Sequence, residues 1–330
     1  MKKLVFRLAL LALSVAVAGV FLIVLEAGAR FFFPEINFQG TSKTLIRNQR
    51  EEKIFGNIPD SEGVSFGAVA HIDGLGMRKT AFSPITGADG SYLVIGDSVT
   101  FGVGVEDERT FVAILQKKLP GVRLLNSAVI GSGPVQYKQA AEQYLGSTPG
   151  IKKVVLFFCI NDVADMDNGL KGNQPDDKGN TVKRITHPLM QALQANSKLF
   201  LLLKNVAFDR SRQYTLFNSG LYGETNPSFI AAMKTLKEIA GMAKTANVEF
   251  IVTLLPSEYQ LRENTPELLK ARKLVAGYLS QENIKFIDPH DYFLNAGGSS
   301  KDYFLYADDC HLSEKGHQVM ADFLGGQLVN

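Results

Sequence analysis

The chain has 330 residues, and 45% of them are apolar, so it can bury a sizeable core as one large domain or two modest ones. Its formal net charge is +2 and it contains no basic run, which gives no electrostatic support for nucleic-acid binding. No glycine pattern matches a phosphate-cradling loop, and we expect no cofactor.

The first residues predict a membrane anchor. Lys2, Lys3 and Arg7 precede Leu8 to Leu25, a run of 18 residues without a charge that is just long enough to span the hydrocarbon as a helix. A cleaved secretory signal is the alternative, with its cleavage site at residues 16–18. Cleavage there would leave an apolar new N-terminus, which favours the uncleaved anchor.

The basic residues on the N-terminal side of this run keep that end in the cytoplasm. We therefore expect residues 1–33 to be a single-pass signal-anchor in the inner (cytoplasmic) membrane, with the lipid bilayer as a partner and the rest of the chain on the periplasmic side. Residues 34–89 are expected to form a membrane-proximal linker and a core-packing extension. Within them, the polar stretch from Gln39 to Asp60 is interpreted as linker, and Gly74 to Arg78 as a turn beside the core.

From residue 90 onward, short apolar runs alternate with helical segments. The predicted strands are Tyr92–Ile95, Val122–Leu125, Lys153–Phe158, Glu249–Leu255 and Lys285–Ile287. The predicted helices are Thr110–Leu119, Gln136–Leu145, Ser228–Ala246, Pro266–Glu282 and Leu312–Leu324. Apolar strands between amphipathic helices predict an α/β fold: a three-layer α/β/α (flavodoxin-like) sandwich with a central parallel sheet of about five strands. This domain is expected to span residues 90–330.

Residues 163–227 interrupt the alternation. They contain a polar loop at residues 173–180 and an apolar helix near residues 197–208. An insertion of this length usually lies on one rim of the sheet, and we expect it to act as a cap or a substrate-binding element.

Polar or Gly-rich turns follow the predicted strands, and in an open parallel sheet such turns share one rim, where ligands bind. The first strand runs into Gly96, Asp97 and Ser98. The second is followed by a turn at residues 126–133, which contains Gly131. The third is followed by Asn161 and Asp162. The loop before the last helix, beyond the last strand, carries Asp308 and His311. These turns together supply the parts of one hydrolytic site.

Each part has a chemical role. Ser98 is a weak nucleophile at its own pKa and needs a base, which His311 supplies if Asp308 orients its ring. The oxyanion formed on attack at an ester carbonyl needs preorganised donors, for which the backbone N–H groups of Ser98 and Gly131 and the Asn161 amide are candidates. Gly96, Asp97 and Asp162 are expected to shape the site.

Structural readings of the same residues compete with these roles. Gly-Asp-Ser alone is a common turn tripeptide, and Asp97 is expected to bond backbone N–H groups of that turn. His290, at the end of a strand, is the one competitor for the base, whereas His317 is expected on the surface of the last helix. The joint occurrence of all parts after strands favours catalysis.

Only two cysteines occur, Cys159 and Cys310, both beside candidate site residues. Export to an oxidising compartment permits a disulfide between them, and two small buried thiols are the alternative. The sequence contains no His, Cys and carboxylate cluster with the spacing of a metal site, so we expect no metal.

These motifs resemble the SGNH, or GDSL-type, hydrolase superfamily. Its four signature blocks correspond here to residues 96–102, 126–131, 161–162 and 308–311. The resemblance implies the roles already given for Ser98, His311, Asp308 and the oxyanion donors. One departure is that Cys159 holds the position where the third block usually has glycine. The anchored layout is similar to that of exported bacterial members, which implies a role at cell-surface or exported carbohydrates.

The favoured hypothesis is a serine esterase that removes acetyl or another short acyl group from such a carbohydrate, with an acylated carbohydrate or another acyl ester as substrate. A lysophospholipase- or thioesterase-like acyl hydrolase is an alternative, with the apolar helix around Leu199–Leu203 lining an acyl groove. An O-acyltransferase of a surface polysaccharide is another alternative. Exported transferases similar to this fold often place their Asp and His ahead of the Ser, whereas here the pair follows it, which favours hydrolysis. An inactive assembly factor is the non-enzymatic alternative, and the intact triad residues argue against it.

Overall fold

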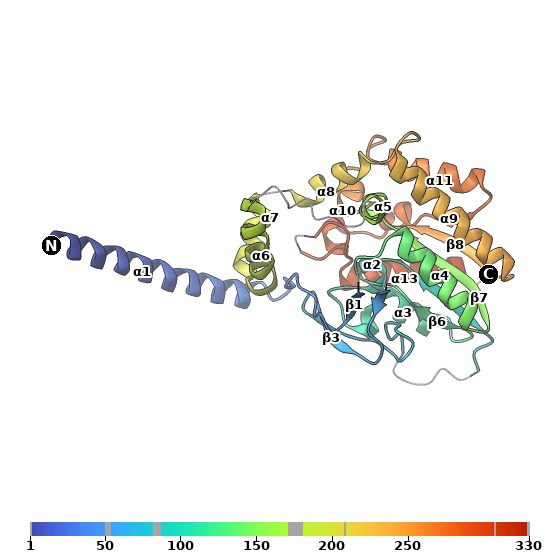
Figure 1. Cartoon of the computed structure of the whole chain (residues 1–330), viewed down its shortest axis with the longest axis horizontal. Coiled ribbons are helices and arrows are strands. Elements are labelled where there is room, and N and C mark those ends of the chain that lie inside the picture. The colour runs from blue at the N-terminus through green and yellow to red at the C-terminus, as the bar shows by residue number, and fades with distance from the viewer. Residues whose placement is uncertain are drawn as a thin grey trace.

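A long helix, α1 (Lys2–Phe32), projects from an α/β body in the computed structural model (Figure 1). The structure describes residues 2–49, 54–81, 87–170, 181–207, 209–306 and 308–328. Its strands are β1 (Ile46–Gln49), β2 (Ile54–Asn57), β3 (Glu62–Ser65), β4 (Ala68–His71), β5 (Ser91–Ile95), β6 (Arg123–Asn126), β7 (Ile151–Phe158), β8 (Glu249–Leu254) and β9 (Lys285–Ile287). Its other α-helices are α2 (Ser98–Phe101), α3 (Phe111–Lys118), α4 (Pro134–Ser147), α5 (Asp162–Leu170), α6 (Thr181–Asn196), α7 (Lys198–Ala207), α8 (Arg210–Ser219), α9 (Pro227–Thr245), α10 (Glu258–Glu263), α11 (Lys270–Gln281), α12 (His290–Asn295) and α13 (Glu314–Leu328), with short 3-10 turns η1 (Asp107–Arg109) and η3 (Ser300–Tyr303).

The central sheet has five parallel strands in the order β6-β5-β7-β8-β9. Seven of the eight residues of β7 are buried, as expected for a strand covered on both faces. Helices α4 and α9 pack together on the sheet, as do α3 and α13. The predicted α/β fold with a parallel sheet of about five strands is confirmed.

The strand order places a topological switch point at the ends of β5 and β7. From β5 the chain crosses to β6 on one side, whereas β7 leads to β8 on the other. At such a point the following helices leave toward opposite faces and open a crevice beyond the carboxyl ends of the strands. Residues 96–98 and 159–162 follow these two strands.

Residues 34–89, expected to form a linker and a core-packing extension, contain two antiparallel hairpins, β1–β2 and β3–β4. The first of these lies within the stretch Gln39–Asp60 that was interpreted as linker. Leu45 is completely buried in a small second cluster with Ile72, Phe101, Val103 and Ala128. The hairpins therefore pack against the body, since Ala70 of β4 belongs to the cluster that contains Phe101 of α2 and Ile46 of β1 packs against it. The predicted turn at Gly74–Arg78 does lie beside the core, since Met77 and Arg78 are both buried.

The predicted insertion contains α5 to α8, and the apolar helix expected near residues 197–208 is α7. The loop predicted at residues 173–180 lies outside the described residues. Helix α7 contacts both α1 and α6, and these helices meet where α1 reaches the body (Figure 1).

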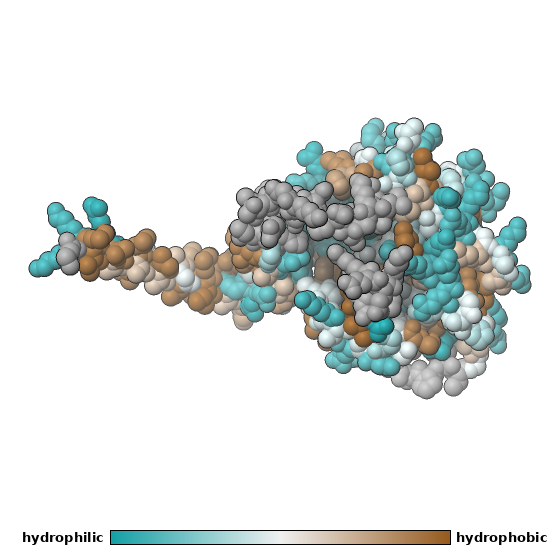
Figure 2. All heavy atoms as spheres, viewed as in Figure 1, coloured by the Kyte–Doolittle hydropathy of each residue, from teal (hydrophilic) through white to brown (hydrophobic). Residues whose placement is uncertain are grey.

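Helix α1 is 31 residues long, and none of its most apolar stretch is buried against the protein. Figure 2 shows its hydrophobic surface beyond a polar N-terminal tip. Its length and composition suit a membrane crossing, and an anchor and a signal sequence both have this form.

Candidate active site

Ser98 is presented by a tight turn between β5 and α2. Asp97 is the N-cap of α2, and its carboxylate accepts a hydrogen bond from the backbone N–H of Val99 at 2.9 Å, as predicted for this turn. Gly96 is required by close packing, because a Cβ there would lie 2.1 Å from the hydroxyl oxygen of Thr100. As the first residue of α2, Ser98 has an N–H without a partner inside the helix.

Ser98, His311 and Asp308 form one chain of hydrogen bonds. The Nε2 atom of His311 lies 2.8 Å from Ser98 Oγ, and its Nδ1 lies 2.9 Å from Asp308 Oδ1. Asp308 Oδ1 also accepts backbone N–H bonds from Asp309, Cys310 and His311. The carboxylate is therefore held from several directions and fixes the imidazole facing the serine.

Charges around the imidazole favour its protonated form. Burial alone would lower the pKa of His311, but Asp308, with support from Asp97 and Asp309, raises it above its ordinary value. Burial would likewise raise the pKa of Asp308, yet His311 and the backbone N–H groups hold this pKa well below its ordinary value. The pair matches a base that accepts a proton beside a fixed carboxylate.

The turn that carries Gly131 is tied to the residue before Asp97. Gly96 O accepts hydrogen bonds from the Ser132 hydroxyl at 2.9 Å and from the Val129 N–H at 3.2 Å. Gly131 has φ = +80°, a backbone conformation that a side chain would strain, and it is exposed. These bonds fix the Gly131 turn next to the serine turn.

Asn161 follows β7, and its amide is held by a residue that the sequence did not single out. Its Nδ2 donates to Asp165 Oδ2 at 2.7 Å, from one helical turn away on α5. Burial, together with the nearby Asp97, raises the pKa of Asp165 to about 7, although the bond from Asn161 opposes this shift. The spacing of four residues was the available signal for this pair.

Asp162 is a structural member of the site. One carboxylate oxygen accepts from the Tyr137 hydroxyl at 2.8 Å and the other from the Cys159 N–H at 2.9 Å. The side chain is completely buried, and burial, with Asp97 nearby, raises its pKa well above the ordinary value. It therefore ties α4 to the end of β7.

The remaining histidines considered from sequence do not contact Ser98. His290 binds the Asn264 side-chain oxygen at 2.9 Å, and burial with the Arg272 charge lowers its pKa to about 4. The prediction that His317 is a surface residue is wrong. It is completely buried and its Nδ1 accepts the Phe111 N–H at 3.0 Å, which fixes α13 against α3. Burial lowers its pKa to about 3.

Both cysteines are buried free thiols. Two effects raise the pKa of the Cys310 thiol: first a hydrogen bond with Cys159, and then, as the smaller effect, burial. This thiol therefore stays protonated. Possible metal-ligand atoms of Asp308, Cys310 and His311 lie within 4.8 Å of one another. Two members of this cluster already bind each other, because His311 Nδ1 contacts Asp308 and His311 Nε2 contacts Ser98.

Two residues of the N-terminal extension support the site without any motif to signal them. Phe66, in the β3–β4 turn, packs edge-on against the His311 ring with ring centroids 5.1 Å apart. Arg78 is buried and binds Asp107 and the backbone oxygens of Phe101, Gly102 and Val105. Arg78 thereby fixes the loop that follows α2.

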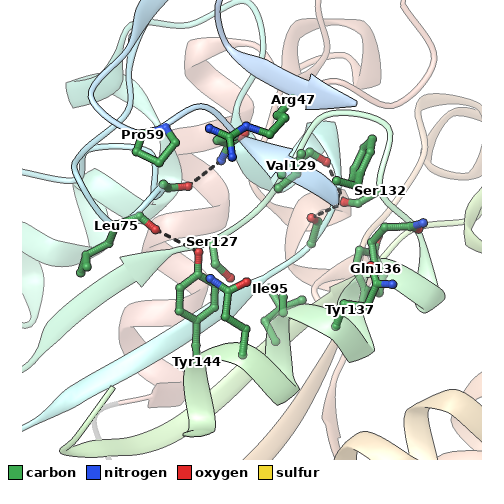
Figure 3. A pocket seen from close by; sticks show the side chains of 18 residues that line it. Arg47, Pro59, Leu75, Ile95, Ser127, Val129, Ser132, Gln136, Tyr137 and Tyr144 are labelled. Carbon is green, nitrogen blue, oxygen red and sulfur yellow. Dashed lines mark hydrogen bonds between the residues drawn. The ribbon is translucent and has the colours of Figure 1, made fainter. Parts of the chain in front are cut away.

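Two cavities of mixed polar and apolar lining adjoin these elements. One of about 190 Å³ lies between the β1–β2 hairpin and α4, and Figure 3 shows Arg47 on one side of it and Gln136, Tyr137 and Tyr144 on the other, with Ser132 of the Gly131 turn in its wall. The other, of about 290 Å³, is lined by Asp308 and by residues from the end of α7 to α10, together with residues 301–306.

Known proteins similar to this chain include solved structures and one protein family. Similar solved structures include a lipolytic protein of the G-D-S-L family from Veillonella parvula DSM 2008, with 18% identity and a TM-score of 0.42 over 72% of this chain and 97% of that one. Another is an acetylxylan esterase from Geobacillus stearothermophilus, with 16% identity and a TM-score of 0.45 over 75% of this chain and 97% of that one. No curated protein sequence matches the chain. A model of the GDSL-like lipase/acylhydrolase family matches residues 94–319. The chain therefore belongs to the GDSL-like lipase/acylhydrolase family.

Proposed function

We propose that the protein is a serine esterase that hydrolyses O-acyl esters through an acyl-enzyme on Ser98. One observation carries this proposal: the hydrogen-bond chain from Asp308 through His311 to Ser98. Ser98 is half-buried, so its hydroxyl stays accessible at the crevice. The same proposal includes the expected division of the chain into an anchor at residues 1–33, a linker and core-packing extension at residues 34–89, and a hydrolase domain at residues 90–330.

In the first step, Ser98 Oγ attacks the ester carbonyl while His311 Nε2 takes the proton of the Ser98 hydroxyl. His311 then donates this proton to the departing alcohol, which leaves the acyl group on Ser98. A water molecule, deprotonated by His311, attacks the acyl-enzyme and releases the acid. Asp308 stays ionised and stabilises the imidazolium in both halves of the reaction.

The negative charge that develops on the carbonyl oxygen needs donors that are already in place. We assign this role to the N–H groups of Ser98 and Gly131 and to the second Nδ2 hydrogen of Asn161, whose first hydrogen is bound to Asp165. The left-handed Gly131 turn and the Asp165 bond support this assignment, because each fixes one donor before substrate arrives.

For the substrate we propose a short acyl group, acetyl in the first instance, on a cell-surface or exported carbohydrate. The 190 Å³ cavity supports this choice, because Gln136, Gln139, Gln143 and Tyr144 offer polar contacts of the kind that sugar hydroxyls require. The apolar α1 helix supports a location at the membrane with the site on the periplasmic side.

A second candidate substrate is an acyl ester or thioester derived from the membrane. It is favoured by the apolar Val206, Phe304 and Leu305, which line the cavity that also contains Asp308. A longer acyl chain could lie along these side chains.

The test is hydrolysis of p-nitrophenyl esters of increasing acyl length, together with acetate release from an acetylated glycan. The proposal expects the highest kcat/KM for acetate and no turnover above background for Ser98→Ala. A kcat/KM that rises steadily with chain length would transfer the assignment to membrane-derived acyl chains. Acyl transfer to an added sugar in preference to water would indicate a transferase.

A further inference from the structure

We propose that α6 and α7 form a second membrane contact, in which an apolar face of this helix pair rests on the bilayer that α1 crosses. We call the exposed side chains of Leu189, Met190, Leu203 and Val206 the α6–α7 face. The proposal rests on α1 remaining attached as an anchor, and it goes beyond the proposed esterase activity.

Polar contacts lock the α6–α7 pair to the C-terminal part of α1. The Glu26 carboxylate accepts hydrogen bonds from the Ser197 hydroxyl at 2.8 Å and from the backbone N–H groups of Lys198 and Leu199 at 3.1 and 3.0 Å. A carboxylate at a helix N-terminus satisfies otherwise unpaired donors and the helix dipole. Arg30 donates to Asn196 O at 2.7 Å.

A third contact continues this junction beyond α1. The Lys198 ammonium, which is buried, donates to the backbone oxygens of Phe33 and Pro34 at 3.0 and 2.9 Å. The end of α6 also contacts the segment that follows α1, because the Gln39 N–H donates to Gln194 O at 2.9 Å. The helix pair is thus attached to the anchor itself and not only to the catalytic body.

The position of Glu26 sets the height of the pair relative to a bilayer. Glu26 directly follows the uncharged run Leu8–Leu25, which would fill a hydrocarbon core ~30 Å thick. At a rise of ~1.5 Å per residue, Arg30 lies only about 6 Å further along the helix axis. The headgroup layer is roughly 5–8 Å thick on each side, so the junction with α7 falls within it.

At that height, the helix pair exposes apolar side chains that nothing in the described protein covers. Leu203 is 60% exposed and Val206 85% exposed on α7, and Leu189 is 58% exposed on α6. Among residues 198–206 of α7, only Lys198 and Leu201 are buried against the protein. Figure 1 shows α6 and α7 across the end of α1, between it and the catalytic body. Helices with such faces lie in the plane of a membrane interface.

This contact would orient the active site as well as hold it near the membrane. Asn205 and Val206, at the end of α7, line the same cavity as Asp308. Further along, Arg210 at the start of α8 lies 3.5 Å from the Asp309 carboxylate, next to the triad. A bilayer that seats α7 therefore fixes one wall of the crevice, and the substrate would enter parallel to the membrane surface.

The absence of tryptophan from the sequence permits a direct test. Single tryptophans are introduced as Leu189→Trp and Leu203→Trp in the full chain, which is reconstituted into phosphatidylcholine vesicles with or without bromine on the acyl chains near the headgroup. Phe21→Trp in α1 is the positive control. Ile230→Trp, at a 51% exposed position on α9, is the matched control away from the junction.

We expect brominated lipid to lower the emission of Leu189→Trp and Leu203→Trp at least about twofold, because interfacial helices bury their apolar face ~5–10 Å into the headgroup and acyl boundary. Phe21→Trp should be quenched and Ile230→Trp unaffected. A lipid-borne photoreactive probe should also label peptides from residues 188–206 of the unsubstituted chain, which requires no substitution at the face.

Quenching of Phe21→Trp without quenching at 189 and 203, and without lipid labelling of residues 188–206, would overturn the proposal. Unquenched emission at 203 that shifts with protein concentration would mean that a second copy covers the face. Lack of quenching at Phe21→Trp would remove the anchor and the proposal together. None of these outcomes depends on ester hydrolysis, so they are separable from failure of the esterase assignment.

Discussion

In the proposed mechanism His311 must be neutral to take the proton of Ser98, whereas its surroundings favour the protonated imidazole. The facing Asp308 carboxylate raises the pKa of the imidazole, although burial works in the other direction. The ordinary value is about 6.5. Activity should therefore be lost as pH falls through a value above this one.

The corresponding prediction concerns the pH dependence of kcat/KM on a soluble acetate ester. Its acid limb should have a midpoint above about 6.5, because only the neutral imidazole acts as base. Asp308→Asn should lower kcat by roughly 10⁴-fold, as for the equivalent change in another Ser-His-Asp enzyme, and move the limb to lower pH. An unchanged pH profile in Asp308→Asn would show that the Asp308 carboxylate does not set the pKa of His311.

A second prediction concerns Asn161 and the residue that orients it. Asn161→Ala should lower kcat by roughly 10²–10³-fold with little change in KM, which is typical for loss of one oxyanion donor. Asp165→Asn should lower kcat by a smaller factor, because the amide stays in place but loses its charged acceptor. Asn295→Ala, an exposed amide on α12, is the control and should behave as wild type. Equal losses in KM and kcat would indicate a general structural effect.

At this scale the sequence predicts the side chains that meet at Ser98 better than the residues that hold them in place. Ser98 and His311 are recognisable because each lies in a turn beyond a strand of a sheet that is itself readable. Phe66 is not recognisable, since its role depends on a side-chain contact across the fold. For Asp165 the four-residue spacing from Asn161 was the available signal. The prediction for His317 failed for a related reason. As a polar residue of an amphipathic helix it was expected on the protein surface, but it is buried and accepts a hydrogen bond from another helix.

Among the elements, the loop from α2 to α3 depends on a buried arginine. Arg78 is 1% exposed and binds the Asp107 carboxylate and the backbone oxygens of Phe101, Gly102 and Val105. Removal of this side chain would take the guanidinium donor from the backbone oxygens of residues 101, 102 and 105. It would also leave the buried Asp107 carboxylate without its guanidinium partner, although its bonds with His71 would remain. The cost of breaking such a pair exceeds that of a surface ion pair.

Arg78→Ala should therefore lower the free energy of unfolding by about 3–5 kcal/mol, measured by denaturant titration. The matched control is Arg109→Ala, which removes a 65% exposed side chain 3.6 Å from Glu314 and should cost only ~0–1 kcal/mol. Similar losses for the two variants would contradict the structural role given to Arg78.

The junction of α1 and α7 makes its own prediction. Glu26→Ala removes the acceptor of the first N–H groups of α7, and a cap of this kind contributes about 1 kcal/mol to helix stability. Amide hydrogen exchange in residues 198–202 should become faster, whereas exchange in α9 should not change. Glu35→Ala, an exposed carboxylate just beyond α1, should leave α7 unaffected. Unaltered exchange in Glu26→Ala would show that the helices are held by other contacts.

The central elements could be predicted because strands buried on both faces appear in sequence as apolar runs, as in β7. The hairpins β1–β2 and β3–β4 could not, because their strands have only four residues each and their amino acids do not alternate between apolar and polar. Leu45, buried among residues from α2 and β4, becomes a core position only once the fold has brought them together.

For the whole molecule, helix α1, the α6–α7 pair and the α/β body form a connected series. Helix α1 contacts α7, residues at the end of α7 line the cavity beside Asp308, and Phe66 of the extension packs on His311. The crevice beside Ser98 is thus linked to α1 through side-chain contacts and not through a free tether. Removal of residues 1–33 would therefore release the body and also expose the N-terminus of α7.

The proposed function depends on Ser98 being a nucleophile activated by His311. The most direct measurement is covalent labelling of the full-length protein with a fluorophosphonate, located by mass spectrometry of its peptides. We predict one adduct on Ser98, none in Ser98→Ala, and a labelling rate that falls at least about 10³-fold in His311→Ala, because the hydroxyl is a weak nucleophile without its base. An unlabelled Ser98 in folded protein, or labelling at the same rate without His311, would contradict the account.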